Sequence, residues 1–361
     1  MTKPKSEILK PLAASALLSL AAGIMLTSAV LRANPPASKP EVKGLHIDGD
    51  PRTGSVKWTY KGVDNGIEYD ISGYIQVPEA SYGAGPFPAM IVTHGSNQRA
   101  AGIVANFSNI ARHWGGGVVV IGASMTHATP PDNAGKPNEG RGACEANLLR
   151  AAKCLDILAQ FNKEKHGFSV NMNKVAAYGF SMGGSLTTML LGDPRTAEKF
   201  YMGAIAGSGE GSTGVTKEMV RGIKAPLLIL HGNDDTTDGG KNTPAGKRSV
   251  RAEKMIETLG GTTIKFSSGN SLRPEANKGV DFDKTYNWKT RPLPELFERD
   301  PKRYTLVSKG TNDKFRLIIY DTGQHVSIAA PAGTYLIPAF KDWVLRTGFL
   351  GYLDRPPPSG Q

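Results

Sequence analysis

Residues 174–184 read Lys-Val-Ala-Ala-Tyr-Gly-Phe-Ser-Met-Gly-Gly, an apolar run that leads into a serine set between glycines. The apolar run predicts a buried strand, and the small residues after Ser181 suit a helix that packs closely on that strand. Gly179 and Gly183 leave room for a sharp turn between the two elements. Such a turn would hold the Ser181 hydroxyl clear of the backbone, where it can act as a nucleophile.

Predicted strands and helices alternate on both sides of this turn. Apolar and alternating runs predict strands at 55–61, 67–77, 87–93, 117–121, 174–179, 201–206, 226–231 and 315–320. Helical spacing is found at 103–114, 141–161, 216–223, 247–259 and 335–347. This alternation predicts an α/β protein in which helices cover both faces of a mostly parallel, twisted sheet of about eight strands.

Residues 1–33 differ in character from the rest of the chain. Residues 1–10 are basic, residues 11–31 carry no charge, and small residues lie near the end of this segment. The pattern is typical of a cleaved secretory signal, and the uncharged run is also long enough for a single uncleaved membrane anchor. Both alternatives place the body of the protein outside the cytoplasm, either periplasmic or secreted.

The remainder divides into a linker at 34–53, one α/β domain at 54–350 and a Pro-rich tail at 351–361 that we expect to be disordered. The domain carries a long insertion, at about 265–312, before its last strand. An insertion of that length forms either a lid over a pocket or a solvated excursion, that is, a loop that extends into solvent without covering a site. The Lys and Arg residues are scattered without a nucleic-acid motif, so the net charge of +11 predicts a solvated basic surface and no nucleic-acid partner.

The chain has two cysteines, Cys144 and Cys154. Both fall in the helix predicted at 141–161, where about 15 Å would separate them, too far for a disulfide. We therefore expect two unpaired thiols, because a bridge would require Cys144 to lie in a loop that folds back. Two cysteines also lack the spacing of a metal site, and we expect neither a metal nor a cofactor.

A serine nucleophile needs a base, and the base needs an orienting acid. In a parallel sheet both should lie just beyond the carboxyl ends of later strands. The strand at 226–231 leads into Gly-Asn-Asp-Asp, and the strand at 315–320 leads into Asp-Thr-Gly-Gln-His. The order Ser181, Asp235, His325 is the one expected for a serine at such a turn, with Asp234 as the alternative acid.

The negative oxygen that forms when a serine attacks a carbonyl also needs N–H donors. The backbone N–H of Met182 is one candidate, and that of Ser96, after the strand at 87–93, is the second, with Asn97 as its alternative. Asn97 and His127, the latter in the loop after the strand at 117–121, are candidate pocket residues. His94 and His231 each begin a His-Gly turn at a strand end, where we expect the imidazole to hold loops together.

With these motifs the chain resembles α/β-hydrolases of the dienelactone hydrolase-like branch, over about residues 67–348. The resemblance rests on the His94-Gly95 pair, the turn at 179–184, the acid loop at 231–235 and the terminal loop at 323–325. It implies an α/β-hydrolase fold with Asp235 as the acid. Dienelactone hydrolase itself has a cysteine where this chain has Ser181, so its lactone chemistry does not carry over.

The expected activity is therefore that of a serine hydrolase that cleaves small carboxylic esters through an acyl-enzyme, without a cofactor. The membrane would be a partner only through an uncleaved N-terminal segment. Two alternatives are a peptidase or amidase of the same superfamily and a non-catalytic binding protein that retains the fold.

Overall fold

The computed structural model describes residues 44–96, 98–125, 142–233, 235, 248–266, 304–308, 310–320, 325 and 336–351. Within these ranges the strands are β1 (Leu45–Ile47), β2 (Val56–Asp64), β3 (Ile67–Gln76), β4 (Phe87–Thr93), β5 (Val119–Ala123), β6 (Val170–Phe180), β7 (Met202–Ala206), β8 (Leu227–Gly232), β9 (Thr262–Phe266), β10 (Tyr304–Ser308) and β11 (Phe315–Tyr320). The helices in the same ranges are α1 (Ala100–Asn106), α2 (Ser108–His113), α3 (Glu145–Leu158), α4 (Lys163–His166), α5 (Met182–Gly192), α6 (Lys217–Gly222), α7 (Arg248–Leu259) and α10 (Leu336–Arg346), with short 3-10 helices η1 (Ala80–Tyr82) and η2 (Ala197–Lys199).

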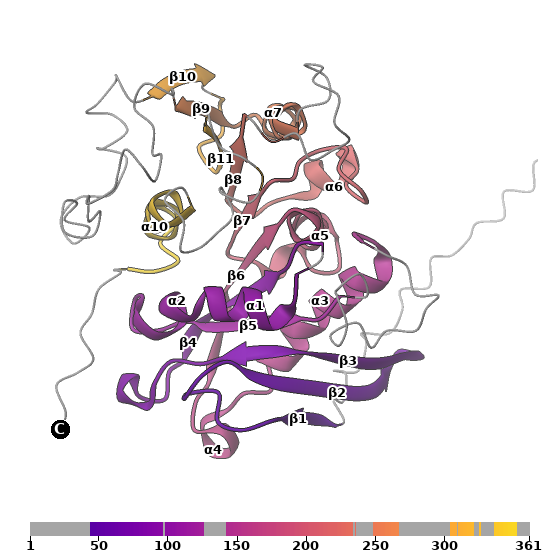
Figure 1. The fold of residues 1–361 in the computed structure, drawn as a ribbon, viewed down its shortest axis with the longest axis vertical. Coiled ribbons are helices and arrows are strands. Elements are labelled where there is room, and N and C mark those ends of the chain that lie inside the picture. The colour runs from indigo at the N-terminus through magenta and orange to yellow at the C-terminus, as the bar shows by residue number, and fades with distance from the viewer. Residues whose placement is uncertain are drawn as a thin grey trace, which may run out of the picture. The chain divides into compact units, whose positions relative to one another are not determined.

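The described strands form one 11-stranded sheet in the order β1-β2-β3-β5-β4-β6-β7-β8-β11-β9-β10 (Figure 1). The run from β5 to β9 is parallel. Antiparallel strands flank it, because β3 pairs antiparallel with β5 and β10 pairs antiparallel with β9. Every residue of β7 and β8 is buried, as expected for central strands that are covered on both faces.

Helices cover both faces of this sheet. One apolar cluster joins α3, α5, α6 and α7 to one face, through side chains that include Leu148, Leu186 and Met255. A second cluster joins α1, α2 and α10 to the other face, through side chains that include Phe340 and Trp343. The α/β class and the mostly parallel sheet predicted from the sequence are therefore confirmed.

The predicted number of about eight strands is wrong, because β1, β9 and β10 widen the sheet. β1 falls within the predicted linker, and its three residues are too few to show a period. β9 and β10 lie at the borders of the predicted insertion and pair with each other. The lid and solvated-excursion alternatives concern residues 267–303, which lie outside the described ranges.

The predicted helix at 141–161 is also shorter than expected, since α3 begins at Glu145. Cys144 precedes α3 in an extended conformation, and both Cys144 and Cys154 are unpaired, as predicted. Burial raises the pKa of the Cys154 thiol far above its ordinary value, so this thiol stays protonated. Cys154 therefore serves as a packing residue in the core.

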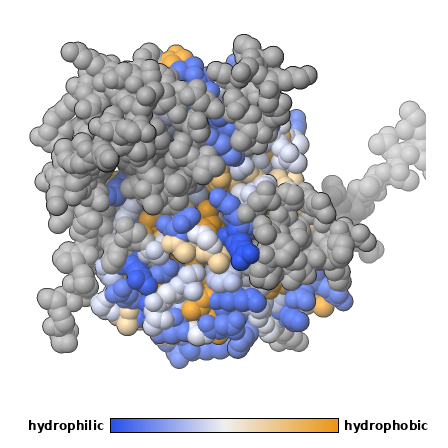
Figure 2. Space-filling view, viewed as in Figure 1, coloured by the Kyte–Doolittle hydropathy of each residue, from blue (hydrophilic) through white to orange (hydrophobic). Residues whose placement is uncertain are grey.

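The described residues contain no helix that is both long and apolar enough to cross a membrane. The predicted signal or anchor at 1–33 and the predicted tail from residue 352 lie outside the described ranges. On the face seen in Figure 2, hydrophilic and hydrophobic residues are interspersed. The large exposed hydrophobic side chains of the described part are Val63, Ile67 and Val307, and scattered exposure of this kind is common on folded proteins.

A buried ion pair fastens the β2–β3 hairpin to α3. The Lys153 ammonium contacts the Asp64 carboxylate, and both side chains are almost completely buried. The same ammonium lies 2.9 Å from Asp156 Oδ2, and 5.1 and 4.3 Å from the ring centroids of Tyr60 and Tyr69. Burial lowers the pKa of Lys153, but its hydrogen bonds to Asp64 and Asp156 raise it more, so the net shift is upward.

We expect Lys153→Met to destabilise the protein by about 3 kcal/mol, because it leaves the Asp64 carboxylate buried without its ammonium partner. The matched control is Lys224→Met, whose partner Glu198 is, like Lys224 itself, about two-thirds exposed. That control should change the free energy of unfolding by less than about 1 kcal/mol. Chemical denaturation of both variants measures the difference, and equal losses would contradict the role given to Lys153.

Candidate active site

Ser181 occupies the turn between β6 and α5, at φ 55° and ψ −118°. Residues other than glycine rarely adopt a positive φ, so the backbone is strained at this position. A Cβ on Gly179 would lie 2.1 Å from the carbonyl oxygen of Gly183. A Cβ on Gly183 would lie 2.0 Å from the carbonyl oxygen of Thr93. Both glycines are therefore required for the sharp turn predicted from the sequence.

The strands beside β6 hold the turn in place. The buried Thr93 hydroxyl, at the end of β4, lies 2.7 Å from the Gly183 carbonyl oxygen and 2.8 Å from the Thr187 hydroxyl on α5. On the other side, the Ser181 N–H donates to the carbonyl oxygen of Ala206 at the end of β7, at 2.8 Å. The strained conformation of Ser181 is thus supported by hydrogen bonds to both neighbouring strands.

The structure brings Ser181, His325 and Asp235 together. Ser181 Oγ lies 2.8 Å from His325 Nε2, and His325 Nδ1 lies 2.6 Å from Asp235 Oδ2. Because an ionised carboxylate only accepts, Nδ1 carries the proton and Nε2 accepts from the Ser181 hydroxyl. The Asp235 side chain is fully buried and the imidazole is 12% exposed. This geometry allows the imidazole to take the hydroxyl proton when Ser181 attacks an electrophile.

The candidate acid Asp235 and the candidate base His325 follow two adjacent strands. β8 and β11 are hydrogen-bonded neighbours that run parallel, with Gly232 opposite Tyr320. The Asn233 N–H continues this pairing by donating to the Tyr320 carbonyl oxygen, at 2.8 Å. Asp235 and His325 each lie a few residues beyond these ends, at the same edge of the sheet. Asp234, the alternative acid, is outside the described residues.

Two residues that the sequence analysis missed hold the His325 ring from its sides. The Phe180 ring lies 4.8 Å from the imidazole, between centroids, at an interplanar angle of 40°. Gly207 follows β7 at φ +66°, and a Cβ there would lie 2.8 Å from His325 Cε1. The only sequence signal for Gly207 was a glycine at the end of a predicted strand. Nothing in the sequence around Gly207 indicates that the His325 ring lies beside it.

The candidate oxyanion donors belong to adjacent elements. Met182 is the first residue of α5, and Ser96 is exposed in the turn after β4. β4 and β6 pair with Thr93 opposite Gly179, so this turn runs alongside the residues that lead into α5. The other two candidates, Asn97 and His127, lie outside the described residues.

His94 ties the turn after β4 to the end of β5. Its Nε2 accepts from the Met125 N–H at 3.2 Å, so Nδ1 carries the proton and donates to the Gly95 carbonyl oxygen at 2.9 Å. His231 is equally buried, and its Nδ1 lies 3.3 Å from the Gly232 carbonyl oxygen. The His94 imidazole therefore joins two loops, as the sequence predicts. The backbone contact of His231 is to the last residue of its own strand, β8, and its Nδ1 also lies 3.9 Å from Asp235 Oδ2.

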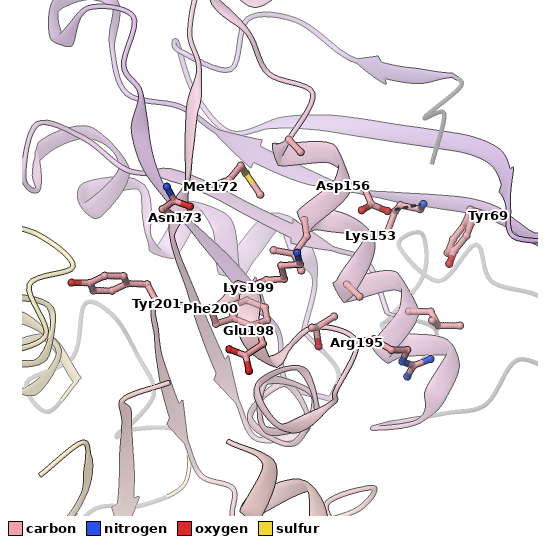
Figure 3. Close-up of a pocket in the computed structure, with 15 residues that line it drawn as sticks. Tyr69, Lys153, Asp156, Met172, Asn173, Arg195, Glu198, Lys199, Phe200 and Tyr201 are labelled. Carbon is pink, nitrogen blue, oxygen red and sulfur yellow. Dashed lines mark hydrogen bonds and ion pairs between the residues drawn. The ribbon is translucent and has the colours of Figure 1, made fainter. Parts of the chain in front are cut away.

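A separate pocket of about 650 Å³ lies at the opposite end of β6 (Figure 3). Met172 and Asn173 contribute to it from the start of β6, Lys153 and Asp156 from α3, and Phe200 from the residue just after η2. About nine residues of extended strand separate Met172 from Ser181, a span of roughly 30 Å. This pocket therefore belongs to a different part of the molecule from the contacts of Ser181.

Within the described residues, no cluster of His, Cys, Asp and Glu could hold a metal.

No family model and no curated protein matches the sequence. The structure is similar to that of a thermostable esterase, at 13% identity and a TM-score of 0.42, over 82% of this chain and 62% of the esterase. It is also similar to an S-formylglutathione hydrolase from Agrobacterium tumefaciens, at 13% identity and a TM-score of 0.44, over 85% of this chain and all (100%) of that one. A cold-adapted esterase from an Arctic intertidal metagenomic library gives 11% identity and a TM-score of 0.46, with coverages of 83% and 97%.

The chain's own strand order and its strand–serine–helix turn are those of an α/β-hydrolase fold. The fold expected from the sequence is therefore the one observed.

We expect Gly207→Ala to slow the reaction of Ser181 with a serine-directed phosphonate about 100-fold, because the added methyl group displaces the His325 ring from Ser181. Gly211→Ala is the matched control, since Gly211 has a similar φ of +78° but open space where its Cβ would lie. Rates of phosphonate labelling measure the effect, with melting temperatures as a check on folding. Equal slowing in both variants would mean that backbone strain, and not contact with His325, is responsible.

Proposed function

We propose that this protein is a serine hydrolase that cleaves carboxylic esters through an acyl-enzyme. The observation that carries the proposal is the pair of contacts Ser181–His325 and His325–Asp235, at 2.8 and 2.6 Å, at the tip of a strained strand–helix turn. Ser181 would be the nucleophile, His325 the general base and Asp235 the group that orients the imidazole.

In the first step, His325 Nε2 takes the Ser181 proton while Oγ bonds to the ester carbonyl carbon. The negative charge that develops on the carbonyl oxygen would be held by the N–H groups of Met182 and Ser96. The ester C–O bond then breaks as the imidazolium returns its proton to the leaving oxygen. An alcohol departs, and the acyl group remains on Ser181.

In the second step, water attacks the acyl carbonyl carbon while Nε2 takes one of its protons. The bond to Ser181 Oγ then breaks, Oγ recovers the proton from Nε2, and the carboxylic acid leaves. Asp235 stays ionised throughout and stabilises the imidazolium that forms in both steps. Its complete burial strengthens this interaction, because water does not screen it.

Esters are the proposed substrates because an alkoxide leaves more readily than an amide nitrogen, which needs fuller protonation. A peptidase or amidase is the second candidate, since the same three residues can serve that reaction. A binding protein that retains the fold is the third candidate. Its Ser181 would be expected to lack reactivity despite the contact with His325.

We also propose that the enzyme acts outside the cytoplasm, as a periplasmic or secreted protein, because of the basic and then uncharged character of residues 1–33. N-terminal sequencing of the mature protein separates the two alternatives for this segment. A new terminus near residue 33 indicates a cleaved signal, whereas an intact terminus in the membrane fraction indicates an anchor.

We expect a fluorophosphonate to label the folded protein at Ser181, and Ser181→Ala to abolish labelling. His325→Ala should slow labelling and ester turnover by about 10⁴-fold or more, since it removes the base. The control Ser169→Ala changes a hydroxyl at the other end of β6 and should be labelled like the wild type. Mass spectrometry of the labelled peptide identifies the site, and a folded wild-type protein that stays unlabelled would sink the enzyme proposal.

We expect p-nitrophenyl esters to be hydrolysed at least about 100-fold faster than the matching p-nitroanilides, because the ester oxygen is the better leaving group. Acyl chains of increasing length in both series would also define the size of the acyl pocket. Faster cleavage of the anilides, or of short peptides, would favour the peptidase candidate instead. Activity that survives in Ser181→Ala would come from a contaminant or another site.

A further inference from the structure

We propose that Phe180 is a positioning residue whose ring holds both the base and the turn that carries a candidate oxyanion donor. This inference rests on the proposed function and adds a residue to its machinery. Phe180 is the last residue of β6 and directly precedes Ser181, and its side chain is only 5% exposed. The direction of the Phe180 side chain is therefore fixed by β6, the same strand that leads into Ser181.

The first contact of the Phe180 ring is with His325, at 4.8 Å between ring centroids. Gly207 borders both rings, because a Cβ there would lie 2.8 Å from His325 Cε1 and 3.3 Å from Phe180 Cε2. The imidazole is thus confined between an aromatic ring and a backbone that lacks a side chain. Its two nitrogens then face Ser181 and Asp235.

The second contact of the ring is with the turn after β4. A Cβ on Gly95 would lie 3.1 and 3.3 Å from Phe180 Cδ1 and Cε1, so the Gly95 backbone packs directly on the ring. The turn itself is closed by Gln98, whose N–H donates to the Gly95 carbonyl oxygen at 3.2 Å and whose Oε1 accepts from the Gly95 N–H at 2.9 Å. Ser96 lies inside this closed turn, so a shift of the ring would move its N–H.

The chemistry of an aromatic ring matters here because the imidazole becomes positively charged during catalysis. An aromatic side chain close to a cation stabilises it through the negative charge of its face, and it also restricts rotation of the neighbouring ring. An aliphatic side chain of similar volume lacks the first effect, and because it is more flexible than a planar ring it restricts the imidazole less. The role of Phe180 therefore predicts a requirement for a ring, beyond a requirement for buried apolar volume.

Phe180→Leu and Phe180→Met test the aliphatic case, and Phe180→Tyr restores a ring. The control is Phe200→Leu, which removes another buried aromatic ring at the far end of the domain, where Phe200 lines the separate pocket. We expect the two aliphatic variants to lower kcat about ten-fold for a p-nitrophenyl ester with KM changed less than two-fold. Phe180→Tyr should stay within about three-fold of the wild type, and Phe200→Leu should lower the melting temperature alone.

Retention of kcat in the folded Leu and Met variants would overturn the proposal, and so would an equal loss of kcat in a folded Phe180→Tyr variant. A second measurement does not depend on turnover. The imidazole C–H signals of His325, followed by NMR, should be single and sharp in the wild type and Phe180→Tyr, and broadened or doubled in the aliphatic variants. Unchanged signals in those variants would contradict the positioning role. A wild type that neither turns over esters nor takes the phosphonate would instead contradict the proposed function.

Discussion

The close approach of α5 to the end of β4 is the constraint on which the site depends. Gly183 lies against the carbonyl group of Thr93 with no room for a methyl group, and the Thr93 hydroxyl bonds to the Gly183 carbonyl oxygen. The chain can leave β6 and enter α5 only through a tight turn, so Ser181 is held at a positive φ. Packing on both sides of the turn offsets the unfavourable free energy of the positive φ at Ser181.

Much of this arrangement is local enough to be predicted from the sequence. The runs at 87–93 and 315–320 coincide with β4 and β11, because short, mostly apolar runs between turn signals allow few other structures. The glycines at 179 and 183 also predict the turn, because the room that they leave for a sharp bend depends on only a few neighbouring residues. The strand ends then indicate which acidic residue and which histidine can meet Ser181, and the structure brings Asp235 and His325 to it.

Other features depend on contacts between distant segments and leave little trace in a local pattern. β9 pairs with β11 and β10, and its sequence Thr-Thr-Ile-Lys-Phe is too short for its alternation to stand out. Phe180 looks like any apolar residue in a strand, and Gly207 like any glycine at a strand end. Their roles become visible only when the His325 ring lies between them.

The place of β11 in the sheet has a consequence for how the site is assembled during synthesis. β11 lies between β8 and β9, although β9 precedes it in the chain. A nascent chain that has emerged through β9 holds Ser181 and Asp235, but it lacks both His325 and β11, the strand that separates β8 from β9. β11 must therefore enter the interior of the sheet after β9 has been synthesised. In addition, His325 contacts Asp235 and Ser181, which lie 90 and 144 positions away from it in the chain. Such long-range closure is slow, so the contacts of His325 with Ser181 and Asp235 form only when the domain is nearly complete.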